Sequence, residues 1–256
     1  MDRVTAQVIG SPIDGINMPD VVERIMGWAR QHASRYVCIC NVHSLVTGRL
    51  DPDFGKVLAE SDLNTADGVP LVWSVRAAGH RAQQRVAGPD LVNPLCASAA
   101  REGISIFLYG STPEVLDKFR EKLAASHPDL VIAGAISPPF RPLDEAEKQE
   151  VIDTINGSGA AIVWVGLGCP KQEKWMAEHR GKLDAVMIGV GAAFDYEIGR
   201  IQRAPRWMRP AGLEWAYRLA QEPRRLFKRY AQTNTLFVAF YVRDRLWRKA
   251  ATDNQR

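Results

Sequence analysis

The stretch that decides the fold spans residues 160–215. It contains AIVWVGLGCPKQEKW (161–175) and AVMIGVGAAFDYEIGRIQRAPRWMRPAGLEW (185–215). The first apolar run meets a glycine turn at Gly166 and Gly168, and a proline then opens a charged, helix-forming segment. This order is typical of a buried strand that delivers backbone N–H groups and a helix N-terminus to one point. Residues 185–190 repeat the pattern, so we expect two strands to end at one crevice, where open α/β sheets bind ligands.

Strands alternate with helices along the rest of the chain. Period and turn residues predict further strands at 4–10, 36–40, 104–109 and 130–135, and helices at 19–31, 54–63, 69–78, 91–101 and 145–156. Such alternation predicts an α/β fold with a mostly parallel, doubly wound (Rossmann-like) sheet and helices on both faces.

The charge of the chain is divided unevenly. Residues 1–195 carry 19 Lys and Arg against 24 Asp and Glu, whereas residues 196–256 carry 14 against five. We therefore expect an α/β domain over 1–195 and a basic helical C-terminal appendage over 196–256, with a helix at 212–222, a break at Pro223 and arginine-rich helices to about Lys249. A basic appendage suits an anionic partner such as nucleic acid, anionic lipid or a phosphorylated substrate.

Cysteine spacing and apolar run lengths bear on the compartment. The four cysteines fit no zinc or disulfide pattern, which favours the reduced cytoplasm. The first ten residues lack the apolar run of a signal peptide, and the run at 236–242 is far shorter than the roughly 20 residues that span a bilayer. Any membrane contact is therefore expected to be peripheral.

Polar side chains at predicted strand ends are the candidates for chemistry. Asp67 follows a short strand beside a glycine, where a carboxylate can act as a general base or simply cap the next helix. Asn41 has the same two interpretations. Lys171 and Gln172 could belong to a solvated first turn, but a cation at a helix N-terminus is unfavourable unless an anion is bound there.

Two motifs resemble known binding signatures but are poor evidence for the sites that those signatures usually mark. The GVGAAFD segment has Phe194 where a dinucleotide fingerprint needs its third glycine, and it lies late in the fold, so an oxidoreductase is disfavoured. Its glycines, Gly189 and Gly191, are instead places where a ligand or helix approaches the backbone. Asp51 and Asp53 have the D-x-D spacing of metal-binding transferases but lie between helices, where aspartates cap. No metal site and no cofactor is expected.

Several long motifs occur in a fixed order: NTADGVPLVW, QQRVAGPDL, FLYGSTPE, VGLGCPKQEKW, GVGAAFD and RAPRWMRPAGLEWAYRLAQEPRRLFKRY. With them the chain resembles the WecG/TagA/CpsF family, glycosyltransferase family 26, over nearly its whole length. The resemblance implies an inverting, metal-independent transferase. Such an enzyme moves a sugar from a UDP-sugar to a polyprenyl-diphosphate-linked saccharide during synthesis of bacterial exopolysaccharide or other surface polysaccharide.

The resemblance also assigns roles to residues. It makes Asp67 the catalytic base and Asn41, Arg85 and Gln172 substrate contacts. Further substrate-binding positions are expected at the strand ends and in the appendage: Gly110, Gly166, Gly189, Gly191, Asp195, Arg218 and Arg224. Where the family often has threonine this chain has Ile39, so a hydroxyl contact of the teichoic-acid enzymes, which use N-acetylmannosamine, is missing. This leaves open whether the sugar transferred or accepted is the same.

The basic appendage is similar to a family segment that docks on the membrane and closes over the active site. This implies an enzyme bound peripherally to the cytoplasmic face of the plasma membrane, partnered by the anionic lipid surface and not by nucleic acid; a homo-oligomer is compatible with it. A non-catalytic nucleotide-sugar-binding or scaffold subunit at the membrane is the alternative from another functional class.

Overall fold

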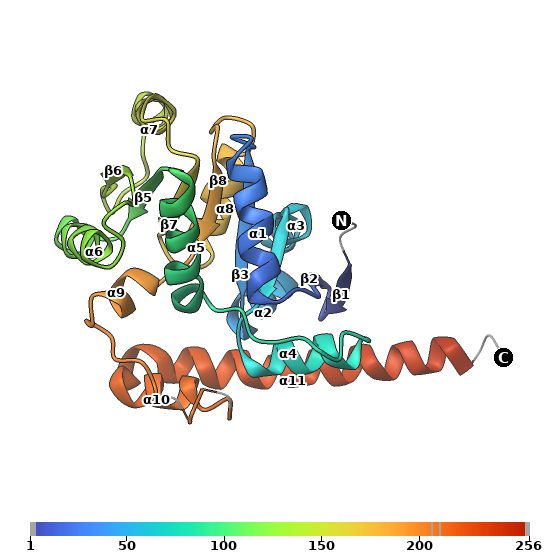
Figure 1. The fold of residues 1–256 in the computed structure, drawn as a ribbon. Coiled ribbons are helices and arrows are strands. Elements are labelled where there is room, and N and C mark those ends of the chain that lie inside the picture. Colours follow the sequence, from blue (N-terminus) through green and yellow to red (C-terminus); the bar gives the residue numbers. More distant parts are fainter. Residues whose placement is uncertain (1–3, 206, 210, 254–256) are drawn as a thin grey trace.

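A computed structural model describes residues 4–205, 207–209 and 211–253 (Figure 1). Its centre is a six-stranded, all-parallel sheet, which confirms the predicted fold class. In spatial order the strands are β4 (Leu63–Ala66), β3 (Arg35–Cys40), β8 (Val186–Gly189), β7 (Ile162–Gly166), β5 (Ile106–Gly110) and β6 (Ile132–Ile136). β7 and β8 are neighbours, with Val165 opposite Gly189, so the two strands of the opening stretch do end side by side.

Helices cover both faces of the sheet because alternate strand residues point to opposite sides. One core layer forms between the sheet and α1 (Met18–Ala29), α5 (Gly88–Glu102), α6 (Pro113–Ser126) and the short α9 (Ala193–Glu197). The other forms against α2 (Val42–Leu50), α3 (Pro52–Glu60), α4 (Val69–Ala77), α7 (Glu145–Gly157) and α8 (Lys171–His179). Trp164, fully buried, belongs to the first layer, and its neighbour Val165 to the second.

The N-terminus differs from the single strand predicted at residues 4–10. β1 (Thr5–Val8) and β2 (Ser11–Asp14) form an antiparallel hairpin outside the main sheet. Ile9 and Gly10 both have positive φ angles, 42° and 91°, which reverse the chain within two residues. Asp14 then fixes the hairpin to the sheet, since its carboxylate accepts a hydrogen bond of 2.7 Å from the backbone N–H of Asn64.

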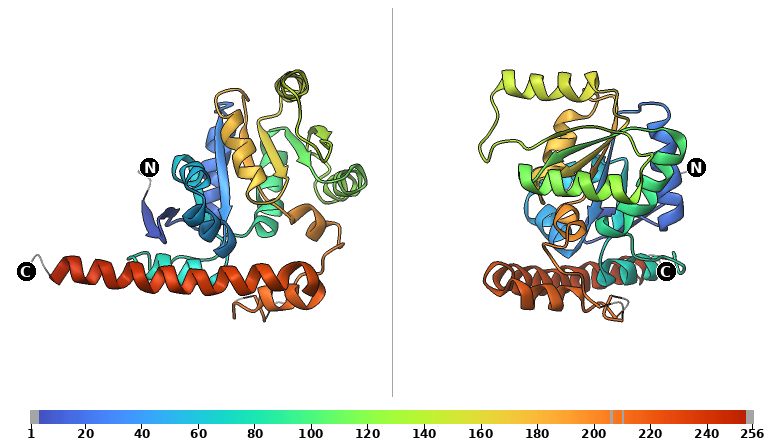
Figure 2. Two further views of the ribbon diagram at one scale, coloured as in Figure 1. Left: turned by 180° about the vertical axis from the view of Figure 1, so that it is seen from behind. Right: turned by 60° about the vertical axis from the view of Figure 1, so that its left-hand side comes forward.

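The C-terminal segment forms two helices, α10 (Glu214–Gln221) and α11 (Pro223–Asp253). The predicted break at Pro223 is confirmed, but the expected arginine-rich helices are one continuous helix of 31 residues. α11 packs along α2, which begins directly after β3, and it therefore lies across the edge where the strands end (Figure 2). Leu226 and Phe237 bury their side chains against the rest of the molecule. No helix in the described residues is both long enough and apolar enough to cross a bilayer.

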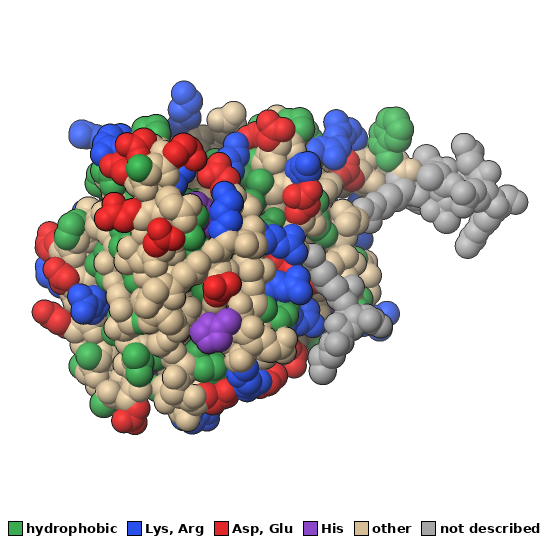
Figure 3. Space-filling view, turned by 90° about the horizontal axis from the view of Figure 1, so that it is seen from above, with side chains coloured by type: hydrophobic (Ala, Val, Ile, Leu, Met, Phe, Trp, Pro, Cys, Tyr) green, Lys and Arg blue, Asp and Glu red, His purple; other side chains and the backbone are tan. Residues whose placement is uncertain are grey.

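The surface away from α11 has mixed charge. Figure 3 shows this side, on which acidic and basic side chains are interspersed. The C-terminal segment contrasts with it, because exposed large apolar side chains recur along it: Trp207, Leu213, Trp215, Phe227, Val238, Val242, Leu246 and Trp247.

Candidate active site

Asp67 lies at the carboxyl end of β4, as predicted. Its backbone N–H donates a 2.7 Å hydrogen bond to the carbonyl of Cys40, which joins the ends of β3 and β4. Gly68, with φ of 101°, occupies the N-cap position of α4, and no side chain caps that helix. The capping interpretation of Asp67 is therefore wrong, and its carboxylate remains available for other contacts.

The surroundings of Asp67 suit a proton acceptor. Its side chain is 26% exposed. Burial raises its pKa from 3.8 to about 6, an effect that the guanidinium of Arg85 opposes and the carboxylates of Glu214 and Asp90 reinforce. A carboxyl group with a pKa near 6 is ionised at neutral pH and still basic enough to accept a proton in a reaction.

Arg85 is held beside Asp67 by its own loop. The N–H of the next residue, Val86, donates to the carbonyl of Ala66 at 3.0 Å, and the Thr65 hydroxyl donates to the Val86 carbonyl at 3.2 Å. These bonds attach the loop to the end of β4. The Arg85 guanidinium consequently reaches to 3.8 Å from the Asp67 carboxylate.

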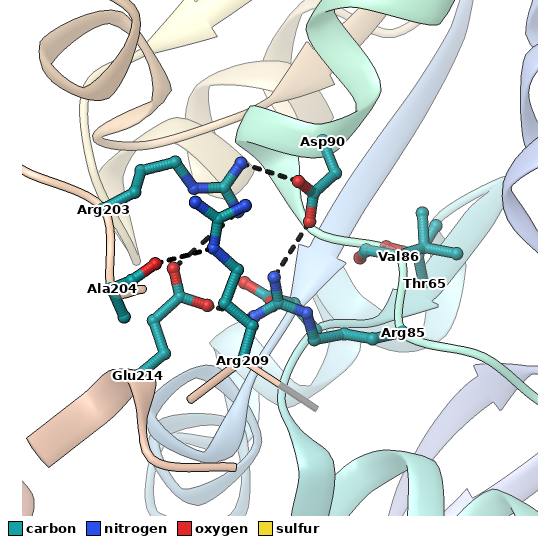
Figure 4. A network of polar contacts seen from close by, with 9 residues as sticks. Thr65, Arg85, Val86, Asp90, Arg203, Ala204, Arg209 and Glu214 are labelled. Atoms are coloured by element: carbon teal, nitrogen blue, oxygen red, sulfur yellow. Dashed lines mark hydrogen bonds and ion pairs between the residues drawn. The ribbon is translucent and has the colours of Figure 1, made fainter. Parts of the chain in front are cut away.

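A cluster of charged side chains surrounds Arg85 (Figure 4). Asp90, at the start of α5, accepts from Arg85 at 2.9 Å and from Arg203 at 2.6 Å. Glu214, at the start of α10, accepts from Arg85 and lies 3.7 Å from Arg203. Although burial acts to raise it, the two guanidiniums hold the pKa of Asp90 below its ordinary value. We call Arg85, Asp90, Arg203 and Glu214 the arginine–carboxylate cluster.

Sequence reasoning missed three members of this cluster. Asp90, Arg203 and Glu214 all lie within the quoted motifs QQRVAGPDL and RAPRWMRPAGLEW, so their presence in charged motifs was the available signal. Their pairing was hidden because Arg85 and Glu214 are 129 residues apart in the chain.

A pocket of about 500 Å³ opens beside the cluster. Arg85 and Asp90 line it together with the adjacent Gln84, with Arg209 of the C-terminal segment and with four residues of α4: Val69, Val72, Trp73 and Arg76. The pocket combines apolar walls with guanidinium groups. This mixture suits an anionic ligand that also carries an apolar part.

Asn41 follows β3 and is a neighbour of the β4 end, because Cys40 lies opposite Ala66 in the sheet. Its side-chain oxygen accepts from the N–H of Ser44 at 3.1 Å, while the Ser44 hydroxyl accepts from the Asn41 N–H at 2.8 Å. Asn41 thus caps α2, which is one of its two predicted interpretations, and it does so next to Asp67. Ile39, two residues earlier, packs in the core at 8% exposure.

Gln172 connects two loops at the same edge of the sheet. It is buried, so the solvated-turn interpretation is wrong for it, whereas Lys171 is exposed. The Gln172 side-chain oxygen accepts from the N–H of Gly168 at 3.1 Å and from that of Gly191 at 2.9 Å. Its amide nitrogen donates to Glu173 at 2.8 Å. Gln172 therefore fixes the chain after β7 relative to the chain after β8.

The strand-end glycines allow close packing. A Cβ on Gly110, where φ is 116°, would lie 2.7 Å from the Gly166 carbonyl, and a Cβ on Gly166 would lie 2.6 Å from the Phe194 ring. A Cβ on Gly189 would lie 2.7 Å from the Met176 side chain. These contacts let the loops after β5, β7 and β8 approach one another.

Three other predicted positions lie in or near the C-terminal segment. Asp195 in α9 pairs with Arg200 at 3.4 Å. The Arg218 guanidinium lies 5.4 Å from the centre of the Tyr196 ring, one helical turn after Glu214 on α10. Arg224 is exposed at the start of α11. The structure thus places Arg218 close to the cluster and leaves Arg224 at the surface.

Asp51 of the D-x-D pair caps α3, as predicted, and Asp53 lies in the first turn of that helix. One Asp51 oxygen accepts from the N–H groups of Asp53 and Phe54, at 3.1 and 3.2 Å, and the other pairs with Lys174 at 2.9 Å. Among the residues that the structure describes, no group of three or more His, Cys, Asp and Glu side chains is arranged to hold a metal ion.

The comparison with protein families gives a match that covers most of the chain. The model of the WecG/TagA/CpsF glycosyl transferase family matches residues 6–251, which include the sheet, the arginine–carboxylate cluster and nearly all of α11. A match over this length includes every motif on which the resemblance was based. The chain therefore belongs to the WecG/TagA/CpsF family of glycosyltransferases.

Proposed function

We propose that this family member is an inverting, metal-independent transferase that moves a hexose or N-acetylhexosamine-type sugar from a UDP-sugar to a polyprenyl-diphosphate-linked saccharide. The product would serve synthesis of an exopolysaccharide or another cell-surface polysaccharide. The observation that carries the proposal is Asp67, a carboxyl group with a pKa near 6 at a strand end, 3.8 Å from the Arg85 guanidinium. A base and a fixed cation are the two groups that this displacement needs.

The proposed step is a single displacement. Asp67 removes the proton from the acceptor hydroxyl, and the oxygen attacks the anomeric carbon from the side opposite the leaving group. The bond from that carbon to the diphosphate oxygen breaks, and its electron pair leaves with UDP. The configuration at the anomeric carbon inverts, and the proton ends on Asp67.

Charge that develops on the leaving diphosphate requires positive partners. Arg85 and the backbone N–H groups at the strand ends would supply them, with Arg218 and Arg224 of the appendage added on closure. Asn41 and Gln172 would arrange the surrounding loops and touch the substrate from the ends of β3 and β7. The strand-end glycines Gly110, Gly166, Gly189 and Gly191, together with Asp195, would border the same substrate.

We propose that residues 196–256 form the appendage that docks this enzyme on the cytoplasmic face of the plasma membrane. Exposed cations at Arg224, Arg225 and Lys228 lie beside exposed Phe227 near the start of α11. Cations attract anionic headgroups, and an aromatic side chain can enter the interface. Docking here would bring the strand ends towards the lipid-linked acceptor.

The deciding experiment measures UDP release from a panel of UDP-sugars mixed with polyprenyl-diphosphate-linked mono- and disaccharides. We expect release with one donor–acceptor pair, retained after metal chelation and abolished in Asp67→Asn. UDP-sugar binding without release from any pair would instead favour a non-catalytic binding or scaffold subunit. Loss of activity on chelation, restored by magnesium or manganese, would contradict metal independence.

A further inference from the structure

The arginine–carboxylate cluster contains buried donors with no hydrogen-bond acceptor. Arg203 uses one terminal nitrogen for Asp90, at 2.6 Å. Its Nε and its other terminal nitrogen, Nη2, are buried and have no hydrogen-bond partner among the described residues. The Glu214 carboxylate lies 3.7 Å from Nη2, which is too long for a hydrogen bond. Buried donors are almost always satisfied, so these two nitrogens give Arg203 hydrogen-bonding capacity that Asp90 does not use.

Two carboxylates bridge the same two guanidiniums, and they differ in how they are held. Asp90 belongs to the α5 start, five residues after Arg85, and is part of the α/β body. Glu214 comes from α10 of the C-terminal segment, which packs mainly against α11, whereas α5 packs against α1 and α9 of the α/β body. Glu214 is therefore the bridge that can be exchanged, whereas Asp90 is fixed.

The Glu214 carboxylate contacts the two guanidiniums in the way that a bound phosphoryl group would. One of its oxygens contacts Arg85 and the other faces Arg203. Two guanidiniums that share one anion through separate oxygens are a common arrangement for binding phosphate. Arg85 and Asp90 also line the 500 Å³ pocket, so this arrangement is reached from a cavity.

The number of carboxyl groups around Arg85 and Arg203 determines whether a diphosphate can bind while Glu214 is in place. Arg85 and Arg203 already face three carboxyl groups: Asp67, Asp90 and Glu214. A diphosphate added to that set would be repelled, because like charges at such distances are unfavourable. If Glu214 leaves, both guanidiniums become available.

We propose that Arg203 and Arg85 form a binding subsite for the phosphoryl oxygens of a diphosphate, and that Glu214 occupies this subsite as an internal counter-ion until the ligand displaces it. Ligand binding is thereby coupled to movement of α10. The inference adds Arg203 and Glu214 to the site and rests on the proposed function only for the source of the diphosphate. That source is either the nucleotide donor or the lipid-linked acceptor.

Titration calorimetry with inorganic pyrophosphate at low salt tests the subsite without requiring transfer. Glu214→Gln should bind pyrophosphate about 10-fold tighter than the wild type, and Arg203→Gln about 10-fold weaker, each being the loss of one charged contact. In the double variant the gain from Glu214→Gln should largely disappear, because the two residues act on the same ligand. Asp244→Asn and Arg141→Gln are the matched controls, since each removes one charge outside the cluster.

The ligand series identifies the source. UDP and a short prenyl diphosphate are titrated in parallel, and the source is the one whose affinity falls in Arg203→Gln. Unchanged pyrophosphate affinity in Arg203→Gln, or unchanged or weaker affinity in Glu214→Gln, overturns the proposal.

Thermal melting checks the fold of each variant. If Glu214→Gln unfolds, Glu214→Asp, whose side chain is one methylene shorter, replaces it and should give an intermediate gain in affinity. Pyrophosphate results as expected, without any sugar transfer, would refute only the proposed function.

Discussion

Asp67 is the residue on which most of the chemistry depends, and its environment predicts how activity varies with pH. Because its pKa is about 6, kcat/KM should rise with pH through that value as the base loses its proton. Asp67→Asn should lower kcat by about 100-fold or more, remove this acidic limb and leave UDP-sugar binding nearly unchanged. Initial rates of UDP release across pH measure all three. Activity within a few-fold of the wild type would exclude Asp67 as the base.

The same residue should make stability depend on pH. Its folded pKa, about 6, lies above the ordinary 3.8, so ionisation is harder in the folded protein than in the unfolded chain. The contribution of Asp67 to stability is therefore complete below pH 3.8 and is lost as pH rises to about 6. Relative to the wild type, Asp67→Asn should gain up to about 3 kcal/mol of unfolding free energy between about pH 4 and pH 7. Urea unfolding measures this, with the exposed Asp129→Asn as control; a constant difference would contradict the shift.

Some site residues could be predicted from the sequence around them, and others could not. Asn41 follows an apolar run, and Asp67 precedes a glycine and a proline that are typical of a helix start, so their positions at strand ends could be predicted from the sequence. The local sequence around Arg203 and Glu214 did not show their role, because that role depends on Arg85, more than 100 residues away in the chain. Pairing between such distant charges leaves no periodic signal.

At the scale of elements, Gln172 is the joint between β7 and β8. Gln172→Ala would leave the N–H groups of Gly168 and Gly191 without their acceptor, at a cost of about 2 kcal/mol in unfolding free energy. UDP release should fall as well, because both loops border the proposed substrate. Gln149→Ala is the matched control, since Gln149 makes a single exposed contact with Asp153. Equal stability of the two variants would contradict this role.

At the junction of α2 and α3, unlike at Gln172, we expect substitutions to change stability and not activity. Asp51 caps α3, so replacing Asp51 and Asp53 together by alanine should lower the unfolding free energy by about 1 kcal/mol. The transfer rate should stay within about two-fold, since neither carboxylate lies in the arginine–carboxylate cluster. Denaturant titration and initial rates test both parts, and a collapse of activity in a folded double variant would restore the metal-binding interpretation.

Elements were predictable where a buried run met a turn signal. The strand at 104–109 followed by Thr112 and Pro113 gave β5 and α6, because threonine before proline is a strong helix start and Thr112 does cap α6. The second strand of the hairpin was missed since Ser11–Asp14 is four residues long and contains a proline. The order of strands was not predictable, because residues 163–165 and 186–188 are apolar throughout and suit any interior position.

At the scale of the whole molecule, the C-terminal segment joins the α/β body at two places. Glu214 pairs with Arg85 and Arg203 with Asp90, and Phe237 packs in the core layer that contains α2. Removing residues 196–256 would therefore expose apolar core as well as delete cations. A docking role is better tested by changing exposed side chains of the intact chain.

Arg225→Gln, Phe227→Ser and Lys228→Gln change three exposed side chains near the start of α11. If this surface docks on the membrane, loss of two cations alone should weaken binding to anionic liposomes by about 30-fold, at roughly 1 kcal/mol each. Wild-type binding should fall as salt rises, because headgroup attraction is screened within a Debye length. Co-sedimentation measures the loss of binding and its salt dependence, with the double variant Arg120→Gln and Arg141→Gln as a control of equal charge.

Transfer to a water-soluble acceptor should persist in the Arg225, Phe227 and Lys228 variant, while transfer to the lipid-linked acceptor falls. Binding that ignores salt, lipid charge and these substitutions would assign this surface to a protein contact instead.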